Sequence, residues 1–208
     1  MEELSKVYAA DAVEAEIRSL WEKGRYYQAP AEVPTGRGRF SIVMPPPNVT
    51  GNLHLGHAFE HALQDALTRW HRMRGDATLW QPGTDHAGIA TQHVIAERLR
   101  QRGQEPLQMG REGFIEQARQ WKDEYERNIL EQARRLGDSA DWSRTRFTMD
   151  EGLSRAVRQV FVTLYERDLI YRGDYIINWC PSCHTALADI EVEHEEREGT
   201  LYHILYPF

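Results

Sequence analysis

Residues 40–57 read Phe40-Ser41-Ile42-Val43-Met44-Pro45-Pro46-Pro47-Asn48-Val49-Thr50-Gly51-Asn52-Leu53-His54-Leu55-Gly56-His57. The first five residues have the composition of a short buried strand, and the three prolines end it. A helix is expected to follow, because apolar residues then recur every three or four positions. We expect this apolar stripe to face the core; it comprises Leu55, Ala58, Phe59, Ala62, Leu63, Ala66, Leu67, Trp70 and Met73.

A second strand and a further helix follow this helix. Gly75 is a typical helix stop, Ala77-Thr78-Leu79-Trp80 is strand-like, and Pro82-Gly83 ends the strand. Another helix is expected from about Ala87 to Arg102. The order strand, helix, strand, helix predicts an α/β fold with a parallel, doubly wound sheet.

The flanking regions carry weaker patterns. Residues 5–30 predict a peripheral helix that ends near Gly24, and 111–136 predict a long solvated helix with Trp121 on its apolar face. A helix over 153–168 is expected to bury Val157, Val160, Phe161 and Leu164. Three further strands are expected over 175–180, 190–194 and 201–208.

Composition narrows the class of protein. The 208 residues include 25 Lys and Arg and 32 Asp and Glu, giving a net charge of −7, and 41% are hydrophobic. This is the composition of a globular protein and excludes a disordered, collagenous or coiled-coil chain. Because neither a secretory signal nor an apolar run of roughly 18 residues is present, we expect a cytoplasmic protein with no membrane partner. We also expect it to be a monomer.

The strand-to-helix junction has the features of a nucleotide site. Ligands of open α/β sheets bind beyond the carboxyl ends of strands, where helix N-termini attract phosphate. His54 and His57 stand three apart, so both imidazoles lie on one face of the first turn, and Gly56 leaves room for a ring or sugar. Thr50, Gly51 and Asn52 are expected to supply the turn and the helix cap. The residues alone therefore predict nucleotide binding.

Two other interpretations of these histidines stay open. His57-Ala58-Phe59-Glu60-His61 matches the H-x-x-E-H pattern of certain zinc hydrolases. The expected burial of Phe59 and Ala62 argues against a metal there. Alternatively, the histidines lie on a helix face and bind no ligand.

Several motifs together resemble a known family. Residues 44–58 resemble the first signature of class I aminoacyl-tRNA synthetases, with His54-Leu55-Gly56-His57 as its "HIGH" element. Pro45–Gly51 followed by Pro82-Gly83-Thr84-Asp85-His86-Ala87-Gly88-Ile89-Ala90-Thr91-Gln92 is similar to the valyl-tRNA synthetase family in particular. Asp141-Trp142-Ser143-Arg144 and the segment 178–189 add to the resemblance.

The resemblance implies a reaction in which valine and ATP give valyl-adenylate, and the valyl group passes to tRNA(Val). His54, Gly56 and His57 would bind ATP, the two histidines would stabilise the transition state, and Mg²⁺ would accompany the nucleotide.

The same resemblance implies an amino-acid pocket. Pro46 and Asn48 would flank it, and Asp85 would bind the ammonium group. From the residues alone, Asp85 is also a suitable cap for the helix after it.

The resemblance also implies a division of the chain. Residues 1–38 would be a helical lead-in and 39–172 the first half of a Rossmann-like catalytic domain. Residues 173–208 would hold the cysteine pair and the start of a β-rich editing domain. An apolar pocket favours valine over threonine by a factor of only about 10². An editing domain therefore hydrolyses the threonyl-tRNA that forms by mistake.

No "KMSKS" element is present, so we expect an N-terminal fragment that lacks full activity alone. The alternative is a non-catalytic, synthetase-derived RNA-binding or regulatory module, which the Arg-rich stretch 98–172 would suit.

Cys180-Pro181-Ser182-Cys183 has the spacing of a zinc knuckle. A structural Zn²⁺ needs four ligands. The resemblance implies that the other two come from a second pair in sequence beyond this chain. Two reduced thiols are the alternative.

Overall fold

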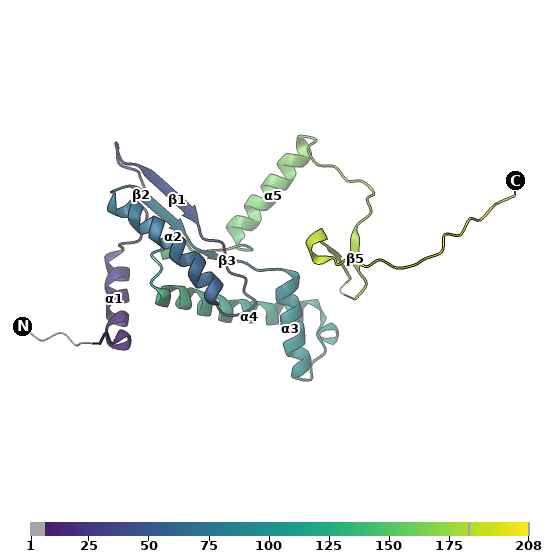
Figure 1. Cartoon of the computed structure of the whole chain (residues 1–208), viewed down its shortest axis with the longest axis horizontal. Helices are drawn as coiled ribbons and strands as arrows, with labels where there is room; N and C mark the ends of the chain where they lie inside the picture. Colours follow the sequence, from purple (N-terminus) through teal and green to yellow (C-terminus); the bar gives the residue numbers. More distant parts are fainter. Residues whose placement is uncertain (1–6, 183, 208) are drawn as a thin grey trace, which may run out of the picture. The chain divides into compact units, whose positions relative to one another are not determined.

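The computed structural model describes residues 7–182 and 184–207 (Figure 1). It divides into two compact units, residues 1–159 and 160–208, which are treated separately below. The first unit contains α1 (Ala10–Gly24), β1 (Arg39–Val43), α2 (Leu55–Met73), β2 (Ala77–Gln81), β3 (Gly83–Thr84), α3 (Ile89–Gln101), α4 (Pro106–Leu136), a 3-10 turn (Trp142–Arg144) and β4 (Arg146–Phe147). Helix α5 (Glu151–Glu166) spans the boundary between the units.

The strands of the first unit are parallel, as predicted. β1 pairs with β2 from Arg39↔Ala77 to Val43↔Gln81, and α2 connects them. β3 pairs in parallel with β4, and the segment that contains α3 and α4 connects them. β2 ends at Gln81, directly before Pro82, as predicted, and the short strand β3 begins at Gly83. Helical crossovers between parallel strands are the defining feature of an α/β fold.

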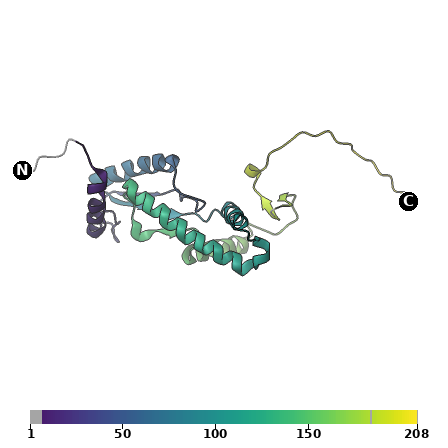
Figure 2. The ribbon, with the colours of Figure 1, turned by 90° about the horizontal axis from the view of Figure 1, so that it is seen from below.

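The predicted helices are present with small changes in their bounds. α1 ends at Gly24, and α3 covers most of the predicted range. α4 begins earlier than predicted, but Gly110, at φ 74° and ψ 170°, interrupts it, so the regular helix is residues 111–136. It runs along the first unit (Figure 2). None of the described helices is both long and apolar enough to cross a membrane.

Two apolar clusters form the core of the first unit. One joins Met44, Trp80 and Ala140, so it links the end of β1, β2 and the segment after α4. The other joins Ile95, Leu99 and Trp121 and packs α3 against α4. The strands are therefore held at the end where the prolines follow β1.

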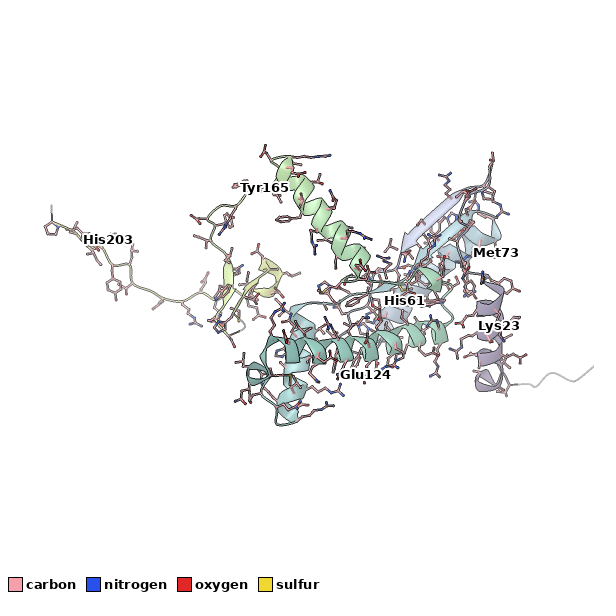
Figure 3. The ribbon with its side chains drawn as sticks, turned by 180° about the vertical axis from the view of Figure 1, so that it is seen from behind. Lys23, His61, Met73, Glu124, Tyr165 and His203 are labelled. Carbon is pink, nitrogen blue, oxygen red and sulfur yellow. The ribbon has the colours of Figure 1, made fainter. Side chains whose placement is uncertain are left out.

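The apolar stripe of α2 does not face this core, so that prediction is wrong. Its large side chains are exposed by 49–88%: Leu55, Phe59, Leu63, Leu67, Trp70 and Met73. The buried positions are instead His61, at 1% exposure, and Thr68, at 0%. Figure 3 shows His61 in the interior and Met73 at the periphery.

Polar contacts explain which side of α2 is buried. Asp65 accepts a hydrogen bond from the Ser139 N–H (3.2 Å), and Arg72 donates to the Ser139 carbonyl (2.6 Å). Arg69 donates to the carbonyl of Gly137, the residue that ends α4 in the left-handed conformation (2.6 Å). These side chains satisfy backbone groups at a helix end that would otherwise be unpaired.

The second unit is less regular than predicted. Its strands are the short antiparallel pair β5 (Asn178–Cys180) and β6 (Thr185–Leu187), followed by a 3-10 turn at Asp189–Glu191. The strands predicted over 190–194 and 201–208 are absent from the described residues, and only the end of 175–180 is a strand. Alternation alone does not make a strand, because each strand also needs a hydrogen-bonded neighbour.

The predicted burial along α5 is also wrong. Val157, Val160 and Phe161 are exposed by 66%, 57% and 63%. The helix itself is present, at Glu151–Glu166, close to the predicted range.

Candidate functional site

Three segments meet at the carboxyl ends of the parallel strands. The Asp85 N–H donates to the Pro47 carbonyl (2.8 Å), and the Val49 N–H donates to the Asp85 carbonyl (2.9 Å), so Asn48 pairs with Asp85. On the other side, the Thr148 N–H donates to the Thr84 carbonyl (3.1 Å). The backbone thus places Asn48 and Thr148 on either side of the segment that carries Asp85.

Helix α4 fixes the loop between β1 and α2. The indole N–H of Trp121 donates to the Val49 carbonyl (2.7 Å), and the Leu53 N–H donates to Gln132 Oε1 (2.9 Å). Both bonds join residues more than 70 positions apart. The sequence identified Trp121 only as a residue of an apolar face, and nothing in it indicated Gln132.

The two signature histidines form the start of α2. His54 is its N-cap: the His54 Nδ1 accepts from the Gly56 N–H (3.1 Å), and the His57 Nδ1 accepts from the His54 N–H (3.2 Å). The ring centroids are 3.9 Å apart. The expected capping by Thr50, Gly51 or Asn52 is therefore wrong. Since each Nδ1 is an acceptor, the neutral rings carry their protons on Nε2 and retain one N–H donor each.

The protonation state of His57 follows from its surroundings. Partial burial lowers the pKa of His57 below its ordinary value of 6.5, and the neighbouring His54 lowers it further. His57 is therefore neutral at pH 7. It acts there as a hydrogen-bond donor and not as a positive charge.

Gly56 has an observed role in this cap. A Cβ atom at this position would lie 2.9 Å from Cε1 and 3.0 Å from Nδ1 of His54. Glycine thus lets the imidazole fold back over the first turn. Room for a nucleotide at Gly56 stays a prediction.

Asp85 is held by Thr148, a residue that no sequence motif indicated. The Thr148 hydroxyl donates to Asp85 Oδ1 (2.8 Å), and the His86 N–H donates to the same hydroxyl (2.9 Å). The N-cap of α3 is Gly88, with no side-chain cap, so Asp85 does not cap that helix. Asp85 is half-buried, whereas Pro46 and Asn48 are exposed, which leaves this edge open to a ligand.

The zinc-hydrolase interpretation of residues 57–61 is wrong. His61 is buried, with its Nδ1 2.7 Å from Asp138 Oδ2, and its Nε2 makes no hydrogen bond among the described residues. No group of three or more potential metal ligands occurs within residues 7–182 and 184–207.

Of the cysteine pair, Cys180 lies among the described residues. Cys180 ends β5 at the turn of a hairpin, where its carbonyl accepts from the His184 N–H (2.9 Å). Cys183 lies outside the described residues, so the knuckle geometry stays a prediction.

The arrangement agrees with a comparison to protein families. Residues 16–204 match the family described as tRNA synthetases class I (I, L, M and V). The chain belongs to the class I tRNA synthetases. The predicted resemblance to this class is thereby confirmed over most of the sequence.

Individual class I synthetases are similar over nearly the whole chain. Valine–tRNA ligase of Geobacter sulfurreducens is 57% identical over 205 residues, which are 99% of this chain and 23% of the relative. That of Treponema denticola is 53% identical over 98% of this chain and 22% of the relative. The chain thus spans less than a quarter of the length of these relatives.

A solved structure shows the same fold. The LeuRS of Agrobacterium radiobacter, in a ternary complex with tRNA and LeuAMS, matches with a TM-score of 0.71 and 22% identity. The match covers 88% of this chain and 21% of that chain. The expected Rossmann-like class I arrangement is confirmed by this likeness.

Proposed function

We propose that this chain is part of a valine–tRNA ligase and contains its amino-acid site and one half of its ATP site. The parallel pairing of Asn48 with Asp85 carries the proposal, because it places a carboxylate beside the loop that leads to the His54 cap. The identity of 53–57% to valine–tRNA ligases supports valine as the amino acid.

The chemistry of the residues fits adenylate formation. The carboxylate of valine would attack the α-phosphorus of ATP, and the bond between the α- and β-phosphates would break to release pyrophosphate. The Nε2–H donors of His54 and His57, with the free N–H groups of the α2 N-terminus, would stabilise the added charge. Mg²⁺ held by phosphate oxygens would neutralise part of that charge. The valyl group would then pass to tRNA(Val).

The amino-acid end would be bound at the strand edge. Asp85 would pair with the ammonium group of valine, and Pro46 and Asn48 would flank the pocket that holds the amino acid. Burying a charged ammonium without a counter-charge is costly, so Asp85 is the residue on which valine affinity depends most.

The division of the chain follows the same proposal. Residues 1–38 are the lead-in, 39–172 the first half of the catalytic domain, and 173–208 the start of the editing insertion. The second half of the catalytic domain would cover the exposed apolar side of α2. Zn²⁺ would be held by Cys180 and Cys183 together with two ligands from the rest of the full-length protein. We expect that protein to be a monomer.

Valine-dependent exchange between ATP and pyrophosphate tests the proposal in the full-length protein. Asp85→Asn should raise the valine KM far more than the ATP KM, because it removes the counter-charge. The matched control is Asp123→Asn, at an α4 carboxylate that is 70% exposed. Absence of exchange in the wild type would contradict the proposal and favour a non-catalytic RNA-binding module.

A further inference from the structure

The Thr148 hydroxyl, directly after β4, has three polar neighbours. They are Asp85 Oδ1 (2.8 Å), the His86 N–H (2.9 Å) and His86 Nδ1 (2.6 Å). A hydroxyl has one proton to donate and two lone pairs. An ionised carboxylate accepts only, so the proton goes to Asp85. His86 must then fill both lone pairs, which requires its ring proton to be on Nδ1.

This network fixes one oxygen of the carboxylate and leaves the other available. Oδ1 accepts from Thr148 and lies 3.2 Å from the protonated Nδ1 of His86. Among the described residues, Oδ2 of Asp85 makes no hydrogen bond. The side chain is therefore held in one orientation with a free acceptor at the open edge of the sheet.

The hydroxyl is not needed to hold the strands together. Thr148 is already tied to the sheet by its own backbone N–H, which donates to the Thr84 carbonyl (3.1 Å). β4 is further tied by the bond from the Arg146 N–H to the Pro82 carbonyl (3.2 Å). Loss of the hydroxyl should thus change the carboxylate's orientation and leave the backbone pairing in place.

We propose that Thr148 is a positioning residue for amino-acid binding, which orients Asp85 so that Oδ2 receives the substrate's ammonium group. The proposal rests on the proposed function. His86 completes the unit by donating to Thr148 from both its backbone and its ring.

Three variants of the full-length protein test this role in valine-dependent ATP–pyrophosphate exchange. Thr148→Val removes the hydroxyl and should raise the valine KM about tenfold while the ATP KM changes less than about twofold. Thr148→Ser keeps the hydroxyl and should restore the valine KM. Thr145→Val is the matched control, because its hydroxyl donates to the Trp142 carbonyl (2.9 Å) and not to Asp85.

A double variant separates positioning from general damage to the fold. In an Asp85→Asn background, Thr148→Val should raise the valine KM no further, because the carboxylate that it orients is gone. Inhibition by 3-methylbutanoate, which has neither the ammonium group nor another hydrogen-bond donor in its place, should be the same in wild type and Thr148→Val.

The outcomes distinguish this inference from the proposed function. A wild type without valine-dependent exchange overturns both. If the wild type exchanges and Asp85→Asn raises the valine KM, but Thr148→Val behaves like Thr145→Val, only the positioning role is overturned. A serine variant as impaired as the valine variant, or equal losses for valine and ATP, also overturns it.

Discussion

Replacing Asp138 by alanine should strongly destabilise the first unit. Asp138 and His61 are 5% and 1% exposed, and their contact of 2.7 Å is shielded from water. His61 Nε2 already lacks a partner, so the variant leaves the ring without either hydrogen bond. Removing one partner from a buried pair costs about 3–5 kcal/mol, and we expect a loss of about 3 kcal/mol in the free energy of unfolding.

Urea unfolding of the isolated chain, followed by circular dichroism and tryptophan fluorescence, measures this loss. The control is Asp123→Ala, which removes an exposed carboxylate 3.2 Å from Lys122 and should cost less than about 1 kcal/mol. Combining Asp138→Ala with His61→Leu should recover part of the stability, because no polar group is then left unpaired. Equal losses for the two alanine variants would refute the burial of the pair.

Three further predictions concern protonation and exposure. Burial raises the pKa of Asp138 above its ordinary value of 3.8, so the native state binds this proton more tightly than the unfolded chain does. Wild-type stability should therefore fall relative to Asp138→Asn as the pH rises from 3.8 through the raised pKa, and parallel pH profiles would contradict this. The NMR titration midpoint of His57 should lie below 6.5 and rise in His54→Gln, whereas an unchanged midpoint would exclude electrostatic coupling. Phe59→Ser should cost less than about 0.5 kcal/mol in the isolated chain, where Phe59 is 67% exposed, but about 3 kcal/mol in the full-length protein; equal costs would mean that nothing covers this side of α2.

The sequence predicted the helices and parallel strands of the first unit because their patterns are local. The 3.6-residue periodicity of α2 and the proline run after β1 each depend on neighbouring positions only. The direction in which α2 packs is a different question, since the helix has an apolar side and a polar side. Asp65 and Arg72 bind residues after α4, and no local pattern indicates that partner.

The residues of the candidate site could be predicted where they lie within a short sequence motif. His54, His57 and Asp85 were named from motifs. Thr148 was not, because it stands 63 positions from Asp85 and meets it only through the two-residue pairing of β3 with β4. His54 as a helix cap was also missed, since the usual N-cap residues Thr50 and Asn52 stand close by.

A crystal structure of the full-length protein with a non-hydrolysable valyl-adenylate analogue tests the central claim most directly. We predict the analogue's ammonium group within hydrogen-bond distance of Asp85 Oδ2, and its phosphate-mimicking group beside the Nε2 atoms of His54 and His57. An analogue bound elsewhere, with this edge of the sheet empty, would contradict the account.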